Sequence, residues 1–456
     1  MRVCIIGTGY VGLTMGACLA DIGHDVVCVD IDGSKITSLC NGVIPVHEPG
    51  LSKIVEKNYK RNTLSFSMDV GEGVSESDIV FIAVGTPFNE KSVDLSHVES
   101  AAKGIAKGIN KYTIIANKST VPVGSAELVK RIILENMVYP HKFDVVSNPE
   151  FLREGSAVKD FLNPDRIIIG TDSQKAAEIM TELYRPLKAP ILITDQISAE
   201  IIKYACNAFL ATKVSFINFI ANLCDAVGAN VKDVATGMGY DKRISFEFLK
   251  AGPGWGGSCL PKDCKTFIKI AEDCGYEFNL LKEVLKVNED QKRLVVVKIR
   301  QLLGDLKDKC IGILGLSFKP NTDDVREAPA IDIINHLQTE CALVKAYDPA
   351  AMENAGRILK GVEFATNAYE VAKDSDMLVL LTEWDEFRWL DFERIKSLLK
   401  KPIIFDTRNC LDSQLLTEFG FVYTGIGVKG ISLEKIQRPE TSLFMEAQGL
   451  EGESLI

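Results

Sequence analysis

The chain has 456 residues, of which 46% are hydrophobic and 25% are charged, and its formal net charge is −10. This length exceeds one ordinary hydrophobic core and predicts two or three globular domains. The acidic charge argues against a nucleic-acid partner, since such proteins usually carry a basic face. No uninterrupted apolar run approaches membrane length, so we also expect no membrane partner.

Twelve cysteines are spread at irregular spacings, many of them within apolar runs, and no Cys-x-x-Cys pair occurs. This pattern is typical of reduced, buried thiols in a cytoplasmic protein. The same scatter, together with only five histidines, contains no metal-binding motif. We therefore predict a cytoplasmic location and no metal site.

The first part of the chain alternates strands with helical segments. Residues 2–12 read as a short apolar strand running into a glycine turn, and the following segment has helical spacing up to Gly23. A second strand within 24–32 ends in acids, and further apolar strands are predicted at 78–84, 112–120, 143–150 and 165–171. Such alternation implies a parallel sheet covered by helices.

A long helix is predicted over 198–229, apolar on most sides and therefore buried between other elements. Lys203 and Asn207 lie four residues apart and share one face of it, either as two solvated side chains or as a functional pair. A second strand–turn pattern begins at 309–320, and its next strand ends in Asp348. Together these segments predict an α/β fold of two doubly wound, Rossmann-like parallel-sheet domains, joined by a long central helix and a helical connector.

The turn after the first strand has the pattern Gly-x-Gly-x-x-Gly, formed by Gly7, Gly9 and Gly12. It follows a strand, opens a helix and is followed by Asp30 at the end of the next strand, which is the full context of a dinucleotide site. The glycines let a pyrophosphate approach backbone N–H groups at the helix N-terminus. Asp30 would accept hydrogen bonds from a ribose and repel a 2′-phosphate, which favours NAD over NADP as cofactor.

Three further loops lie at the carboxyl ends of predicted strands, the edge that faces ligands in open α/β sheets. Thr86 and Thr120 are candidates for the nicotinamide side, although as isolated motifs they indicate only loops. Glu150 and Glu154 are four apart, on either side of Arg153, and could share a helical face for acid–base work. The alternative is an exposed first helical turn, where acids favour the helix dipole.

The stretch "GPGWGGSCLPKD" (252–263) places Cys259 behind four glycines and shortly before Lys262 and Asp263. A thiol presented beside a cation is either a nucleophile or a loop residue with no role. A nucleophilic cysteine beside a dinucleotide site suggests a particular chemistry. The thiol traps an aldehyde as a thiohemiacetal, and a second oxidation gives a thioester that water hydrolyses to an acid. A lysine ammonium, such as that of Lys203, would stabilise the oxyanion.

Six motifs, "GTGYVG", "VGTP", "KSTVPVGS", "NPEFLREGSA", "GWGGSCLPKD" and "GLSFKPNTDDVREAPA", occur here in the order found in nucleotide-sugar 6-dehydrogenases. The chain resembles this family from residue 1 to roughly 430, and "GGSCLPKD" resembles its branch acting on UDP-glucose and GDP-mannose. The resemblance implies an NAD-dependent two-step oxidation of a UDP-sugar, with GDP-mannose as the alternative substrate. It also implies a homodimer or higher homo-oligomer.

The resemblance further implies a role for each matching position. The catalytic residues would be Cys259, Lys203, Asp263, Glu150, Thr120 and Asn207. NAD would be bound by Gly7, Gly9, Val11, Gly12, Asp30, Lys35, Thr86, Thr120, Glu154, Lys262 and Arg326. The UDP-sugar would be held by Glu150, Phe151, Leu152, Arg153, Glu154, Lys203, Asn207, Phe248, Leu249, Lys250, Ala251, Gly252, Gly256, Lys319 and Arg408, with Arg243 reaching it from a neighbouring subunit.

The pattern of strands and helices, together with the family resemblance, also predicts the domain boundaries. We expect an NAD-binding domain at 1–195, a central helical region for dimerisation and the catalytic cysteine at 196–297, a UDP-sugar-binding domain at 298–436 and a flexible tail at 437–456. Two positions depart from the family pattern: Ser245 stands where glycine is frequent, and Trp255 replaces the usual Phe or Tyr.

The sequence is also compatible with two other functions. A single-step 3-hydroxyacid dehydrogenase shares the N-terminal fold and the long helix but needs no cysteine. A non-catalytic NAD-sensing protein would bind cofactor without turnover, against which the run of Cys259, Lys262 and Asp263 argues.

Overall fold

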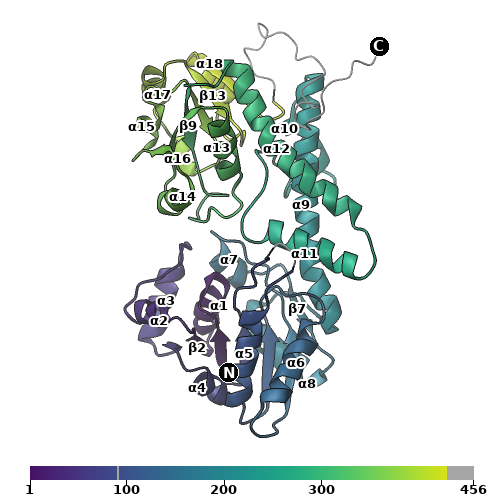
Figure 1. Cartoon of the computed structure of the whole chain (residues 1–456). Coiled ribbons are helices and arrows are strands. Elements are labelled where there is room, and N and C mark those ends of the chain that lie inside the picture. The colour runs from purple at the N-terminus through teal and green to yellow at the C-terminus, as the bar shows by residue number, and fades with distance from the viewer. Residues whose placement is uncertain (90–91, 429–456) are drawn as a thin grey trace. The chain divides into compact units, whose positions relative to one another are not determined.

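Two separate sheets organise the computed structural model, which describes residues 1–89 and 92–428 (Figure 1). The N-terminal sheet has the strand order β3-β2-β1-β4-β5-β6-β7-β8, and the C-terminal sheet has the order β11-β10-β9-β12-β13-β14. The first six strands of each sheet therefore follow the order 3-2-1-4-5-6 of a doubly wound dinucleotide-binding fold. This confirms the predicted fold class and the internal repetition of the layout.

The N-terminal sheet is parallel except where β6 meets β7, which pair antiparallel through Ser147 and Gly170. Its central strands at Ile79–Ile82 and Thr113–Asn117 are buried throughout, as expected for a sheet covered on both faces. The strands are β1 (Arg2–Ile6), β2 (Asp25–Val29), β3 (Leu64–Ser67), β4 (Ile79–Ile82), β5 (Thr113–Asn117), β6 (Phe143–Ser147), β7 (Ile167–Gly170) and β8 (Ile191–Thr194).

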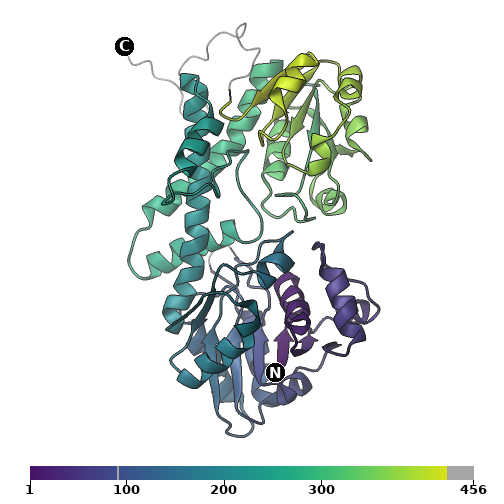
Figure 2. The ribbon, with the colours of Figure 1, turned by 180° about the vertical axis from the view of Figure 1, so that it is seen from behind.

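Helices cover both faces of this sheet (Figures 1 and 2). Val3 and Ile5 of β1 pack into one core with α1, α3, α7 and α8, whereas Cys4 and Ile6 point to the opposite core with α4, α5 and α6. The helices are α1 (Tyr10–Asp21), α2 (Gly33–Cys40), α3 (Leu51–Lys60), α4 (Val70–Glu76), α5 (Ser96–Gly108), α6 (Ser125–Asn136), α7 (Ala157–Leu162) and α8 (Gln174–Tyr184), with a short 3₁₀ turn at Arg185–Leu187.

The C-terminal sheet is fully parallel and is also packed on both faces. Its strands are β9 (Cys310–Leu314), β10 (Leu343–Tyr347), β11 (Val362–Phe364), β12 (Met377–Leu380), β13 (Ile403–Asp406) and β14 (Val422–Gly425). The remaining helices are α10 (Val231–Gly239), α11 (Leu260–Asp273), α12 (Asn279–Leu303), α13 (Pro329–Thr339), α14 (Met352–Ile358), α15 (Ala368–Ala372), α16 (Asp385–Arg388), α17 (Phe392–Leu398) and α18 (Ser413–Glu418).

The long helix α9 (Gln196–Val227) is present as predicted, but its predicted burial is wrong along one stripe. Phe209, Phe216 and Leu223 are exposed on it, because the apolar residues surround the helix while only one side packs against the core. By length and composition α9 could span a membrane, with 33% of its most apolar window buried. Length and apolar composition alone do not indicate a membrane span, since core helices of soluble proteins share both properties.

The chain divides into two compact units. The first comprises Met1–Cys206 with Lys265–Tyr276, and the second comprises Asn207–Cys264 with the chain from Glu277 onward. The helices α9 and α11 each contribute residues to both units. The predicted tail at 437–456 lies outside the described residues.

Candidate active site

In the glycine turn after β1, Gly7 and Gly12 are required by the fold, whereas Gly9 leaves open space. Gly7 has φ +103°, and a Cβ there would lie 2.6 Å from the Ala83 carbonyl oxygen; at Gly12 it would lie 1.9 Å from the Gly7 oxygen. Both glycines are therefore required by the fold itself. A Cβ on Gly9 would meet no atom of the described chain within 4 Å, and Gly9 immediately precedes α1. This open position at a helix N-terminus fits the pyrophosphate of NAD.

Asp30 stands at the end of β2, beside this turn. Its Oδ2 accepts hydrogen bonds from the backbone N (2.8 Å) and Oγ1 (2.7 Å) of Thr8, and its Oδ1 accepts one from the Asp32 nitrogen. Burial opposes ionisation, but these hydrogen bonds and Lys35, 3.9 Å away, hold the pKa of Asp30 below its ordinary value. An ionised carboxylate suits a ribose hydroxyl and disfavours a 2′-phosphate.

The loops after β4 and β5 are tied together. Thr86 Oγ1 donates to the Thr120 carbonyl oxygen at 2.8 Å, and Ser119 Oγ donates to the Val84 oxygen at 2.7 Å. Both residues therefore lie at the same edge of the sheet, and their position at the nicotinamide side stays a prediction.

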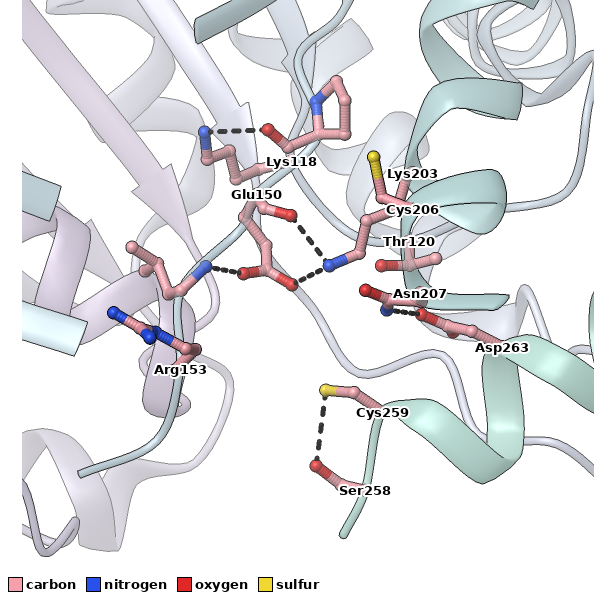
Figure 3. Close-up of polar contacts among 12 residues, drawn as sticks. Lys118, Thr120, Glu150, Arg153, Lys203, Cys206, Asn207, Ser258, Cys259 and Asp263 are labelled. Carbon is pink, nitrogen blue, oxygen red and sulfur yellow. Dashed lines mark hydrogen bonds and ion pairs between the residues drawn. The ribbon is translucent and has the colours of Figure 1, made fainter. Parts of the chain in front are cut away.

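Glu150 and Lys203 form a buried ion pair within the first unit (Figure 3). Lys203 Nζ donates to Glu150 Oε1 at 2.8 Å and to its carbonyl oxygen at 2.7 Å, and the Leu152 nitrogen donates to Oε2. Burial alone would raise the pKa of Glu150, but Lys203, the Leu152 N–H and Lys118 hold it below its ordinary value. Glu150 is thus an anion among cations.

The suggestion that Glu150 and Glu154 share a helical face is wrong. Residues 149–156 form a loop, and α7 begins only at Ala157. The Glu150 carboxylate bends back to the Leu152 nitrogen, and Gly155 adopts φ +79°, so the loop cannot continue as a helix. Arg153 instead makes a bidentate pair with Asp160 of α7.

Lys118 is a buried cation that sequence reasoning missed. Its Nζ donates to Asn148 Oδ1 at 3.2 Å and to the Pro149 oxygen at 3.4 Å, so it holds the segment that carries Glu150 (Figure 3). Burial lowers its pKa to about 8. The charge of Glu150 raises this pKa, and the charge of Lys203 lowers it. Its position beside Thr120 in the sequence was the only available signal.

In the second unit, Asp263 is 1% exposed and accepts a hydrogen bond from Asn207 Nδ2 at 2.6 Å (Figure 3). It also accepts one from Lys262 Nζ at 2.7 Å. Cys259 directly precedes α11 and is exposed, with its Sγ 3.6 Å from Ser258 Oγ. The Asp263 nitrogen donates to the Cys259 carbonyl oxygen and closes the first helical turn. The predicted neighbours Asn207, Lys262 and Asp263 are therefore brought together, and the thiol is accessible.

The glycines ahead of Cys259 have a packing role that the sequence did not indicate. A Cβ on Gly256 would lie 1.8 Å from the Glu327 carbonyl oxygen, and one on Gly257 would lie 2.7 Å from the Phe318 ring. The space at these two positions is filled by the chain itself.

Polar side chains in α9 and α12 fix the backbone of the same loop. Asn218 accepts from the Gly252 nitrogen and Gln291 donates to the Gly252 oxygen, both at 2.8 Å. Asn288 makes a reciprocal pair with the backbone of Trp255, whose indole donates to Ser215. These positioning residues were missed because nothing in their spacing distinguishes them.

Four basic residues are predicted to contact NAD or the UDP-sugar. Two of them contact other residues of the second unit, and two are exposed. Arg408 lies beside Gly252, where an added Cβ would be 3.2 Å from the guanidinium, and it is anchored by the Leu381 oxygen and Glu383. Lys319 lies over the Phe318 ring. Arg326 and Arg243 are exposed, and each pairs with an acid two residues away, Asp324 and Asp241 respectively.

The remaining predicted residues are distributed over these same elements. Val11 lies on α1, Phe151 stacks under the Arg166 guanidinium at 3.6 Å, Leu249 and Ala251 are buried, and Lys250 is exposed. Phe248 and Ser245 have φ of +62° and +60°. A left-handed backbone at Ser245 explains why glycine suits this position.

The acid that ends the second strand of the C-terminal repeat differs from Asp30. Asp348 is completely buried, and its Oδ2 accepts from Leu316, Ser317 and Trp384, while Oδ1 accepts from Ala350 and Ala351. Its acceptor capacity is consumed within the protein, so it cannot serve a second dinucleotide ribose.

The open glycine cradle and Asp30 define a dinucleotide-dependent dehydrogenase with a second, modified doubly wound domain. Comparison with known protein families identifies one family along most of the chain. Sequence profiles of the UDP-glucose/GDP-mannose dehydrogenase family match as its NAD binding domain at residues 1–188, its central domain at 197–290 and its UDP binding domain at 312–413. The chain belongs to this family, and its cofactor is NAD.

Individual proteins that resemble this chain support the same family assignment. The chain is 50% identical to UDP-glucose 6-dehydrogenase TuaD of Bacillus subtilis, over 93% of each chain. It is 48% identical to a UDP-glucose 6-dehydrogenase of Rhizobium meliloti, over 94% of this chain and 99% of that protein. The solved UDP-glucose dehydrogenase of Pyrobaculum islandicum superposes with a TM-score of 0.87 at 37% identity, over 94% of this chain and 98% of the other.

Proposed function

We propose that the protein oxidises UDP-glucose to UDP-glucuronate in two NAD-dependent steps, with Cys259 as the nucleophile. The observation that carries the proposal is an exposed Cys259 at the start of α11, in a chain that is 50% identical to a UDP-glucose 6-dehydrogenase. The overall balance is one alcohol, two NAD⁺ and one water giving one carboxylate, two NADH and three protons. NAD, when bound, supplies the hydride acceptor.

The first oxidation turns the C6 alcohol of the sugar into an aldehyde. The Cys259 thiolate then adds to the aldehyde carbon, and the carbonyl oxygen takes up a proton to give a thiohemiacetal. Lys203 and Asn207, one turn apart on α9, would offer N–H groups to the negatively charged oxygen. A helix N-terminus such as that of α11 also favours negative charge at the sulfur.

The second oxidation removes the C6 hydrogen and the hydroxyl proton from the thiohemiacetal, which leaves a thioester. Water adds to the thioester carbon, the C–S bond breaks, and the thiolate returns to Cys259. Asp263, Thr120 and Glu150 would orient this water and accept its proton. The low pKa of Glu150 makes its carboxylate a weak base, so we assign it chiefly to orientation of Lys203.

We propose that the second unit holds the UDP moiety, through residues 248–252, Gly256, Lys319 and Arg408. The match of residues 312–413 to the family's UDP binding domain supports this assignment. The alternative substrate is GDP-mannose or another nucleotide sugar. Incubation with NAD and each of UDP-glucose, GDP-mannose and UDP-galactose, followed by mass spectrometry, separates them. A uronate from UDP-glucose alone is expected; preferential oxidation of GDP-mannose would overturn the assignment.

We further propose a homodimer or higher homo-oligomer in which Arg243 serves the partner's site. Apolar side chains between 45% and 68% exposed follow one stripe of α9: Phe209, Phe216, Phe219, Leu223 and Val227. Apolar surface of this extent on a helix favours burial by a partner. Arg243, with 89% of its side chain exposed, is available to a second copy.

Mixed oligomers test this arrangement. Cys259→Ser and Arg243→Ala subunits, each inactive or impaired alone, are unfolded, mixed and refolded together. If Arg243 acts across the interface, a mixed dimer contains one complete site and activity reappears. If Arg243 acts within its own subunit, no mixed site is complete and activity stays absent.

We also propose a cytoplasmic location. None of the twelve cysteines is in a disulfide, although only six are buried, and a reducing compartment would keep the exposed thiols reduced. Cell fractionation should place the protein in the cytosol, and its recovery with membranes would reassign α9.

A further inference from the structure

A small cavity lies at the carboxyl end of β5, beneath the loop that carries Thr120. Asn117, the last residue of β5, pairs in register with Ile82 of β4 and Ser147 of β6, and its side chain is only 2% exposed. Neither atom of its amide group has a hydrogen-bond partner in the part of the chain that the structure describes. A buried amide without partners is costly, so such a group requires an explanation.

The cavity provides that explanation. Asn117 lines it together with Ser147, Thr120, Glu200 and Lys203, all of them in the first compact unit. The space has room for about one water molecule, which needs two to four polar partners.

Glu200 adds a second polar wall. It is 5% exposed, and its carboxylate accepts from the Gly124 nitrogen at 2.7 Å, the Ala126 nitrogen at 3.1 Å and Ser147 Oγ at 3.1 Å. These bonds hold the start of α6 and the loop from Thr120 onward. Burial raises the pKa of Glu200, although these hydrogen bonds oppose it. Ionised, a carboxylate accepts about four hydrogen bonds, so capacity remains for one more donor.

We propose that one ordered water occupies this cavity, bonded to the Asn117 amide and the Glu200 carboxylate. This water joins the end of β5 to α9 behind Thr120 and Lys203, and Asn117 is thereby a positioning residue for both. The water site itself rests on the unpartnered Asn117 amide and the Glu200 carboxylate in the cavity lining, whereas its effect on turnover rests on the proposed function.

The sign of a stability change tests for the water. If the cavity were dry, Asn117→Leu would remove an unsatisfied amide and raise Tm. If it is hydrated, leucine displaces a water whose hydrogen bonds it cannot reproduce, and Tm falls by about 3 °C. Thr14→Val is the matched control, because Thr14 Oγ1 on α1 is another buried group without a partner among the described residues and lies outside the cavity lining. Its Tm should stay level or rise.

A second variant separates hydration from packing. Asn117→Ser leaves a larger space with a hydroxyl, so it retains ordered water and most of the activity. Asn117→Leu should lose roughly tenfold in kcat with little change in KM for NAD, as expected for loss of one positioning hydrogen bond. If packing alone mattered, leucine would be the better replacement, and that ranking would overturn the proposal.

A crystal structure of the wild type gives the direct readout. Density for a water within hydrogen-bond distance of the Asn117 amide, absent in Asn117→Leu, is expected. An empty cavity in the wild type, or full activity in Asn117→Leu, would contradict the proposal. Failure of the wild type to oxidise UDP-glucose would instead remove the proposed function and leave the crystallographic result standing.

Discussion

Lys203 and Glu150 form an ion pair that is almost completely removed from solvent: their side chains are 5% and 6% exposed, and Nζ lies 2.8 Å from Oε1. A buried charge is tolerated only with a partner, and loss of one partner leaves the other uncompensated. The pair therefore couples the stability of the first unit to the chemistry proposed for Lys203.

Lys203→Ala should destabilise the first unit by about 3 kcal/mol as well as abolish turnover, because the Glu150 carboxylate stays buried without its main cation. Thermal unfolding measures the loss. Lys60→Ala, which breaks the exposed pair with Glu56, is the control and should leave Tm unchanged.

The pH dependence of this difference follows from Glu150. Its folded pKa lies below the ordinary value of 4.5, so the pair contributes fully above pH 4.5 and is lost as pH falls through the folded pKa. The Tm gap between wild type and Lys203→Ala should therefore narrow in acid. A gap that is constant with pH would mean that Glu150 is not ionised.

Lys118 predicts an opposite, alkaline effect. Its pKa falls from 10.5 when unfolded to about 8 when folded, so the unfolded chain binds more protons between these values and stability rises with pH there. Relative to Lys118→Met, wild type should gain about 2 kcal/mol between pH 7.5 and pH 9.5, measured by denaturant unfolding. The exposed Lys107→Met variant should show no such pH-dependent gain. Parallel pH curves for wild type and Lys118→Met would refute a depressed pKa.

Asp30 should decide the choice between NAD and NADP. Asp30→Asn keeps the shape of the side chain but removes the charge, so the ratio of kcat/KM for NAD over NADP should fall by at least about tenfold. Asp25→Asn, at the exposed start of the same strand, should leave that ratio unchanged. An unaltered ratio in Asp30→Asn would place the discrimination at another residue.

Ser245 carries a local strain that glycine would relieve. At φ +60° a residue with a Cβ is disfavoured by about 1 kcal/mol, partly offset by the greater unfolded entropy of glycine. Ser245→Gly should raise Tm slightly, whereas Ser75→Gly within α4 should lower it, because Ser75 is not among the residues with positive φ. Equal losses in both variants would show that the serine side chain makes a compensating contact.

Local patterns in the sequence predicted the features that depend on local geometry. The Gly-x-Gly-x-x-Gly spacing indicates the turn at Gly7 and Gly12, the end of the second strand indicates Asp30, and strand ends bring Thr86 and Thr120 to one edge. The family resemblance then linked these loops to the Cys259 segment.

Contacts between distant segments could not be predicted in this way. The packing of Gly256 against Glu327, the saturation of Asp348 and the isolation of the Asn117 amide each depend on residues far apart in the chain. The exposed stripe of α9 was missed for a related reason. Composition shows that a helix is apolar on most sides, but it does not show which sides the rest of the chain leaves exposed.

The central claim is the covalent two-step oxidation at Cys259, and the NADH released per UDP-glucose consumed tests it most directly, with the sugar limiting and NAD in excess. We expect about two NADH per sugar in the wild type and a collapse of turnover in Cys259→Ser. One NADH per sugar, together with an active Cys259→Ser variant, would show that Cys259 is only a loop residue and that the roles proposed for its neighbours are wrong.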